Sequence, residues 1–84
     1  MRLRTADLAA RTIDGETIIL DLQSSRYMSV TGVGTRIVEL LAVDTTLENL
    51  VNTIADEYEA DPEVIRRDAQ RFLGRLHAAG LLES

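Results

Sequence analysis

The first third of the chain alternates apolar and polar positions with a period of two, which is the pattern of β-strands. The first run follows Gly15 and places its side chains in two sets on opposite faces: Ile18, Leu20 and Leu22 against Thr17, Ile19 and Asp21. After a polar break at 23–25, a second run sets Met28 and Val30 on one face and Tyr27 and Ser29 on the other. A weaker strand is expected within residues 8–13. The pattern predicts a three-stranded antiparallel meander.

The remaining chain follows the 3.6-residue period of amphipathic helices. The first helix starts at Thr31-Gly32, and its apolar positions are Val33, Ile37, Leu40 and Leu41. Thr45 and Glu48 have the spacing of a capping box, which predicts the start of the second helix. Its apolar stripe is Leu47, Leu50, Val51, Ile54, Ala55 and Tyr58.

The third helix has the sharpest start, because Asp61-Pro62-Glu63 provides an N-cap, a proline at the first position and an acid in the first turn. Its stripe is Ile65, Ala69, Phe72, Leu76 and Ala79, and Gly80 is its expected C-cap. The pattern therefore predicts one α+β domain over residues 1–84, with a three-stranded antiparallel β-meander followed by three helices. The last two helices resemble a winged helix-turn-helix.

Composition narrows the setting in which this domain works. The chain has 84 residues, of which 45% are hydrophobic, and it has no cysteine. A cysteine-free chain has no disulfides or thiolate ligands, which favours a reducing compartment. No signal-peptide core and no apolar run of about 20 residues is present. We expect a cytoplasmic protein that does not associate with membranes.

Residues that could carry catalysis are scarce. His77 is the single histidine, so neither an ordinary zinc site nor a Ser-His-Asp arrangement can form. Gly32-Val33-Gly34 lacks the third glycine of a phosphate-binding loop, and close chain approach explains it better. The acidic residues 56–63 do not match a calcium-binding loop. We expect no enzyme activity, no cofactor and no metal.

The charge pattern gives one argument for nucleic acid and a stronger one against it. Four arginines give the third helix a basic flank: Arg66, Arg67, Arg71 and Arg75. In a helix-turn-helix this helix would enter the major groove. The net charge of −5, however, opposes phosphate binding. A DNA-binding regulator therefore stays as the less favoured alternative, and we expect no nucleic-acid partner.

The strand at 26–30 is the best candidate for a binding element. The last strand of a meander is an edge that offers unpaired N–H and C=O groups, and this one carries no proline or lysine to block pairing. An extended peptide could add to it as a fourth strand. Two alternatives remain open: the third helix could cover the edge, or the edge could pair with a second copy of the chain.

The order and spacing of these signals resemble the PqqD family over nearly the whole chain. The front half carries Ile19-Leu20-Asp21-Leu22, Ser25-Arg26-Tyr27, Thr31-Gly32, Gly34 and Ile37. The back half carries Thr46, Leu50, Asp61, Asp68, Phe72-Leu73, Leu76 and Gly80-Leu81-Leu82. Each piece is a common structural signal, and only their order and spacing are specific.

The resemblance implies a RiPP recognition element, a domain that binds the leader segment of a ribosomally made precursor peptide. In this family the leader lies antiparallel along the third strand, between that strand and the third helix. Carried over by position, the strand contacts would come from Arg26, Tyr27, Met28, Ser29 and Val30. The helical wall would be Asp68, Arg71, Phe72, Arg75 and Leu76.

A free-standing domain of this length is most similar to the B1 leader-binding proteins of lasso-peptide clusters. That similarity implies three partners: a leader with a Tyr-x-x-Pro-x-Leu motif, a separate B2-type leader peptidase, and an ATP-dependent macrolactam cyclase. The alternative within the family is a PqqD-type peptide chaperone that serves a radical-SAM enzyme.

Overall fold

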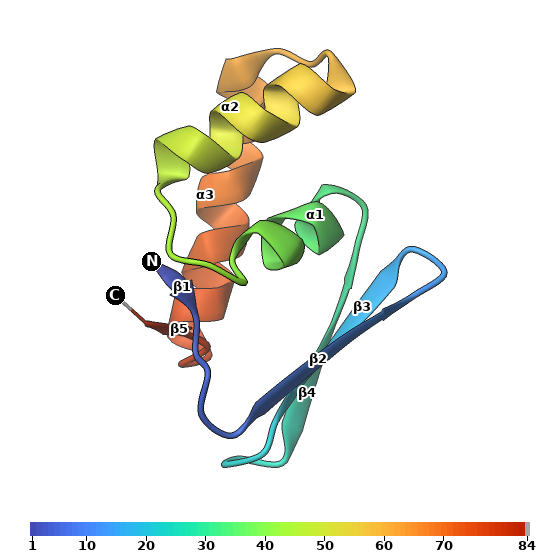
Figure 1. The fold of residues 1–84 in the computed structure, drawn as a ribbon, viewed down its shortest axis with the longest axis vertical. Helices are drawn as coiled ribbons and strands as arrows, with labels where there is room; N and C mark the ends of the chain where they lie inside the picture. Colours follow the sequence, from blue (N-terminus) through green and yellow to red (C-terminus); the bar gives the residue numbers. More distant parts are fainter. Residues whose placement is uncertain (84) are drawn as a thin grey trace.

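The computed structural model describes residues 1–83 and confirms the predicted fold class (Figure 1). The predicted meander consists of β2 (Leu8–Ile13), β3 (Glu16–Asp21) and β4 (Arg26–Thr31). Three helices follow: α1 (Val33–Leu40), α2 (Leu47–Tyr58) and α3 (Pro62–Ala78). Two short strands near the chain ends, β1 (Arg2–Leu3) and β5 (Leu82–Glu83), were not predicted.

The meander is antiparallel in the order β2-β3-β4, with β3 in the centre. Asp14 and Gly15 connect β2 to β3, and both have positive φ angles, 52° and 79°. Two such residues form the type I′ turn, whose twist matches that of the flanking strands. This turn fixes the register, with Ile13 opposite Glu16.

The buried face of β3 is the less apolar of its two faces. Thr17, Ile19 and Asp21 point toward the helices and are at most 9% exposed. The Thr17 hydroxyl is satisfied there by the hydroxyls of Thr12 and Thr35, at 2.7 and 3.3 Å. The other set points away from the helices and is exposed: Ile18, Leu20 and Leu22.

The predicted helices are present, with corrections at their ends. The N-cap of α2 is Thr46, whose hydroxyl accepts the Asn49 N–H, so the predicted capping box at Thr45 is one residue early. The Asp61 cap of α3 is confirmed, because its carboxylate accepts the Glu63 N–H at 2.9 Å. The C-cap of α3 is Ala79, and Gly80 follows it in the left-handed region.

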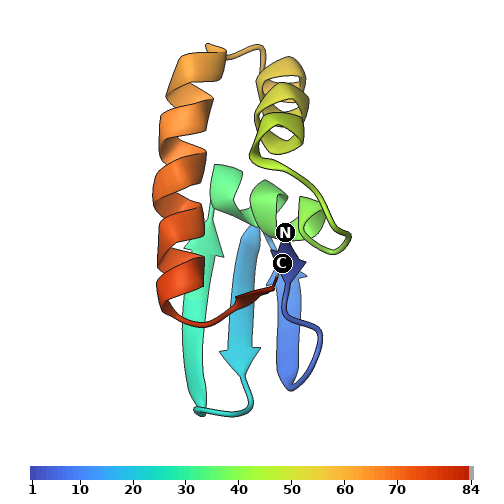
Figure 2. The same ribbon diagram turned by 90° about the vertical axis from the view of Figure 1, so that its left-hand side faces the viewer.

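The core lies between the inner face of the meander and the three helices, and α3 runs beside β4 (Figure 2). Most of the predicted helical stripes are buried in it. Tyr58 and Ala79 were predicted in these stripes but are exposed, because each lies where its helix ends. Leu73 is an additional core residue of α3.

The short β1–β5 pair closes the fold where the two ends of the chain meet (Figure 1). Arg2 pairs with Glu83 and Leu3 with Leu82. The Arg4 N–H then donates to the Leu81 carbonyl at 2.8 Å. This pairing holds the segment after α3 against the start of the chain, close to β4.

Candidate functional site

The candidate site is built around β4, which is an edge strand. Within residues 1–83, β4 pairs with β3 on one side and with no strand on the other. Antiparallel pairing uses the N–H and C=O groups of alternate residues, so the remaining groups of β4 face the space beside the sheet. That space is bordered by α3, and it contains two cavities.

The smaller cavity, of about 220 Å³, lies between the end of β4 and the middle of α3. Ser29, Val30 and Thr31 line it from the strand. Asp68, Phe72 and Arg75 line it from the helix, because positions four and seven residues apart fall on one helical face. The floor is apolar and the rim is charged, with Asp68 and Arg75 both exposed.

The larger cavity, of about 420 Å³, lies between the start of β4 and the end of α3. Arg26, Tyr27 and Met28 line it from the strand. Ala78 and Ala79 line it from the helix end, and their small side chains leave room between the two elements. The two cavities follow one another along β4 and are together called the β4–α3 groove below.

A partly buried ion pair forms part of the wall of the larger cavity. The Asp21 carboxylate lines this cavity and accepts a hydrogen bond from the Arg4 guanidinium at 2.6 Å. This bond and the Gln23 backbone N–H hold the pKa of Asp21 below its ordinary value. Arg4 also donates to the Gly80 carbonyl at 2.7 Å, so it ties the wall to the end of α3.

The structure brings most of the predicted site residues to this groove. The residues that line one of its cavities are Arg26, Tyr27, Met28, Ser29, Val30, Asp68, Phe72 and Arg75. Arg71 is exposed one turn before Arg75 but lines neither cavity. Leu76 is fully buried in the core, so its side chain does not reach the groove surface.

Sequence reasoning missed the part of the groove that other elements supply. Val33, Gly34 and Ile37 of α1 line the smaller cavity. Their position directly after β4 could have suggested this contact. Asp21 and Leu81 line the larger cavity, and no local signal placed them beside β4.

The basic flank of α3 is smaller than the sequence predicts. The Arg66 guanidinium binds the Glu48 carboxylate of α2 through both terminal nitrogens, and it lies 3.6 Å from the Glu63 carboxylate. Arg75 faces the smaller cavity. Of the four arginines, Arg66 is therefore paired with acidic side chains, and Arg75 is exposed at the rim of the smaller cavity.

Two kinds of feature are absent from residues 1–83. Among residues 1–83, no three His, Cys, Asp or Glu side chains gather as a metal site would require. No helix in this range has both the length and the apolar character needed to cross a membrane.

Comparisons with known proteins match this fold. The family described as "Coenzyme PQQ synthesis protein D (PqqD)" matches residues 16–82. A solved structure described as "TbiB1 in Complex with the TbiA(beta) Leader Peptide" is 33% identical with a TM-score of 0.88, covering 100% of this chain and 96% of the other.

A second structure, described as "Lasso peptide synthetase B1 complexed with the leader peptide", is 22% identical with a TM-score of 0.83. The match covers 99% of this chain and 96% of that one, and it shows the same fold. No curated protein matches the sequence.

Proposed function

Because this chain belongs to the PqqD family, we propose that it is a RiPP recognition element that binds the leader segment of a ribosomally made precursor peptide. The observation that carries the proposal is the β4–α3 groove, an edge strand with cavities between it and a helix. Proteins of this fold at 33% and 22% identity are described in complex with leader peptides. These matches favour the lasso-peptide class over a chaperone for a radical-SAM enzyme.

The leader adds to β4 as a fourth antiparallel strand, with its main chain bonded to the strand edge. Arg26, Tyr27, Met28, Ser29 and Val30 supply the strand contacts. Two apolar leader side chains enter the two cavities, where Met28 and Phe72 are the main apolar contacts. Asp68, Arg71 and Arg75 meet polar groups of the leader from α3, and Leu76 acts through the core by supporting Phe72.

The expected affinity follows from a small number of contacts. Four to six main-chain hydrogen bonds at about 1 kcal/mol each set the register. Two or three apolar anchors contribute about 1.5–3 kcal/mol each. Ordering the leader costs roughly 2–5 kcal/mol, and association costs several more. The balance corresponds to a dissociation constant from micromolar to high nanomolar.

In this proposal the chain works by binding rather than by catalysis. It holds the leader and raises the local concentration of the precursor at the proteins that mature it. The implied partners are a separate B2-type leader peptidase and the macrolactam cyclase of a lasso-peptide pathway. The chain itself needs no metal or cofactor for this role.

The direct test is a fluorescence-polarisation titration of a labelled Tyr-x-x-Pro-x-Leu leader with the protein. We expect saturable binding at micromolar concentration or below, and loss of binding when the leader tyrosine is replaced by alanine. A folded protein that binds neither peptide would contradict the proposal.

A matched pair of variants tests whether the groove is the binding site. Phe72→Ala and Leu73→Ala both remove a buried side chain of α3, and only Phe72 lines the groove. Phe72→Ala is expected to lower the free energy of unfolding by about 3–5 kcal/mol, and Leu73→Ala by about 2–5 kcal/mol. Measured on protein that is still folded, Phe72→Ala should weaken leader binding at least tenfold and Leu73→Ala less than threefold. Equal losses in both variants would contradict the groove assignment.

A further inference from the structure

Arg4 lies in the segment between β1 and β2, and its guanidinium group binds three separate parts of the chain. Nη2 donates to the Asp21 carboxylate at 2.6 Å, and Nη1 donates to the Gly80 carbonyl at 2.7 Å. Nε and Nη2 also donate to the carbonyls of Ala6 and Asp7 in the same segment, at 3.0 and 3.2 Å. The side chain is 16% exposed. All three nitrogens are therefore in use, and the group is held in one position.

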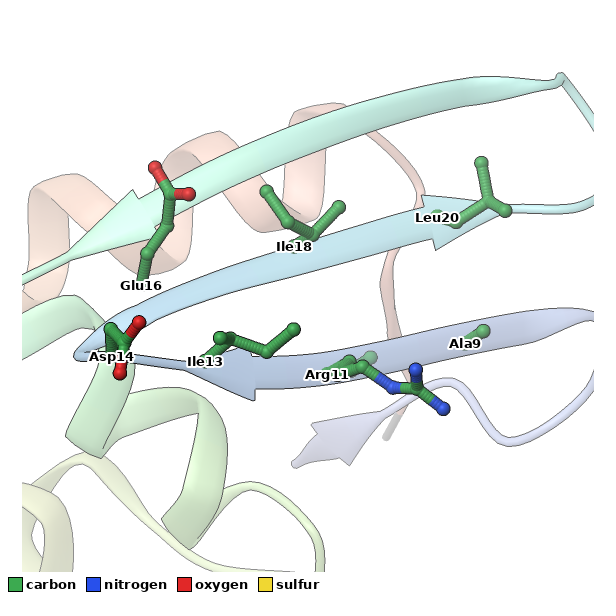
Figure 3. A pocket seen from close by; sticks show the side chains of 8 residues that line it. Ala9, Arg11, Ile13, Asp14, Glu16, Ile18 and Leu20 are labelled. Carbon is green, nitrogen blue, oxygen red and sulfur yellow. The ribbon is translucent and has the colours of Figure 1, made fainter.

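Two of these acceptors belong to two different walls of the larger cavity. Figure 3 shows Leu20 on the outer side of β3, so the alternation of a strand turns its neighbour Asp21 to the other side, where it lines the cavity. Gly80 follows Ala79, which lines the same cavity from the end of α3. Arg4 itself does not line the cavity, so it acts on a side chain bound there only through these two walls.

The polar link between the two walls runs through Arg4. Within residues 1–83, no hydrogen bond or ion pair joins residues 78–83 directly to β3 or β4. The Arg4 N–H holds the Leu81 carbonyl at 2.8 Å, next to the Gly80 carbonyl that the guanidinium holds. One residue thus fixes two consecutive carbonyls after α3. The spacing of the helix end from the sheet therefore depends on Arg4 as well as on apolar packing.

The residue type at position 4 is matched to this link. A guanidinium spreads five donors over a plane, whereas a lysine ammonium carries its three donors on one atom. The Asp21 and Gly80 oxygens are bound by different nitrogens of that plane, so a lysine cannot hold both in the same way. Arg4 also precedes residues 16–82, which match the family, so the match gives it no role.

We propose that Arg4 is a positioning residue for leader binding, which sets the distance between the two walls of the larger cavity so that one apolar leader side chain fits between them. This inference rests on the proposed leader-binding function. Loss of the Arg4 bonds then weakens the contacts made in the larger cavity, while those in the smaller cavity keep their strength. A residue that only stabilised the fold would not show this selectivity in protein that is still folded.

The test is the leader titration by fluorescence polarisation, on variants whose fold is first verified by circular dichroism. Arg4→Lys keeps the charge and removes the bridging geometry. The matched control is Arg2→Lys, because Arg2 lies two residues earlier, pairs with Glu83 and lines neither cavity. We expect Arg4→Lys to weaken leader binding at least about fivefold, and Arg2→Lys to change it by less than about twofold.

Double variants show through which cavity the effect passes, because substitutions that act on one contact are not additive. Met28 lines the larger cavity and Arg75 the smaller one. Added to Met28→Ala, Arg4→Lys should weaken binding by less than about twofold, whereas added to Arg75→Ala it should keep its effect of about fivefold or more. A full effect in both backgrounds would overturn the proposal.

A measurement on the unmodified protein covers the case in which Arg4→Lys does not fold. The Nε–H groups of Arg4 and Arg36 are both hydrogen-bonded, at 3.0 and 2.9 Å, and Arg36 lines neither cavity. Because leader binding and the closed Arg4 network favour each other, the leader should slow hydrogen exchange at the Arg4 Nε–H at least about threefold more than at Arg36. Equal slowing at both groups, or none at Arg4, would contradict the positioning role.

Two outcomes separate the role of Arg4 from leader binding itself. No leader binding by the folded, unmodified protein would overturn the proposed function, and the role of Arg4 with it. Leader binding that Phe72→Ala weakens and a folded Arg4→Lys leaves unchanged would overturn the role of Arg4 alone and leave the proposed function intact.

Discussion

Gly34 shows how one missing side chain shapes the smaller cavity. It lies in the first turn of α1, where the helix passes close to β4 and α3. A Cβ atom built on Gly34 would lie 2.5 Å from Cγ1 of Val30 and 3.6 Å from the Phe72 ring. The Val30 contact is shorter than real Cβ atoms allow, so any larger residue requires either a different Val30 rotamer or a shift of the strand or the helix.

Gly34→Ala is therefore expected to destabilise the fold by about 1–3 kcal/mol through overpacking, and to narrow the smaller cavity. The control is Gly74→Ala in the exposed middle of α3, where nothing lies within 4 Å of the added atom. The free energy of unfolding of that variant should rise by up to about 1 kcal/mol, because alanine has a higher helix propensity than glycine. Urea denaturation measures the free energy of unfolding of both variants and of the unmodified protein. A Gly34→Ala variant as stable as the unmodified protein would contradict the predicted overpacking.

At the level of elements, the end of α3 determines the shape of the larger cavity. The Gly80 N–H donates to the His77 carbonyl and the Leu81 N–H to the Leu76 carbonyl, at 3.0 Å each. This is the Schellman pattern, and Gly80 has the positive φ of 74° that the pattern needs. The turn sends Leu81 back into the core, where it also lines the larger cavity.

Gly80→Ala should cost about 1–2 kcal/mol of folding free energy, because an alanine is strained at this φ. Gly80→Asn should cost less, because asparagine tolerates the left-handed region. The order of the two thermal-unfolding midpoints checks the prediction. Equal midpoints would mean that the strain at this position is not what the turn depends on.

At the level of the whole molecule, ion pairs link segments that are far apart in the chain. Arg36 of α1 donates two hydrogen bonds to the Glu57 carboxylate of α2, at 2.9 and 2.8 Å. Arg66 joins α3 to Glu48 of α2, and Arg4 joins the start of the chain to Asp21. In each pair the arginine hydrogen bond lowers the pKa of the carboxyl group, with ordinary values of 3.8 for Asp21 and 4.5 for the glutamates.

These lowered pKa values determine the sign of the pH dependence. A carboxyl group with a lower pKa in the folded state adds stability above its unfolded pKa and loses it as the pH falls through the folded pKa. The urea midpoint should therefore be flat from pH 7 to about pH 5.5 and fall below about pH 4.5.

Glu57→Gln should be less stable at pH 7 and should lose less stability on acidification. Asp56→Asn is the matched control, because its carboxylate has no ion-pair partner within residues 1–83. The measurement is the urea midpoint of each variant at pH 7 and at pH 3.5. If Glu57→Gln keeps the full acid dependence, this pair does not contribute to it.

The local signals of the sequence were enough to predict the order of the elements, whereas the residues expected to line the groove came from the resemblance to a known family. The period of two in 16–30 and the Asp61-Pro62 start of α3 depend on neighbours within a few residues, so they survive in the tertiary structure. The errors lie at ends that tertiary contacts set, such as the α2 cap at Thr46 and the exposed Tyr58. The β1–β5 pair joins the two chain ends, which no local pattern can reveal.

By itself, then, the sequence determined a meander with an edge strand followed by three helices, because strand and helix periods are local properties. Only the tertiary structure decided which face of β3 is buried. Both faces carry apolar residues, and the less apolar one is inside because Thr12 and Thr35 satisfy Thr17, while Arg4 neutralises Asp21. Those partners come from another strand, a helix and the start of the chain, so this choice required the complete fold.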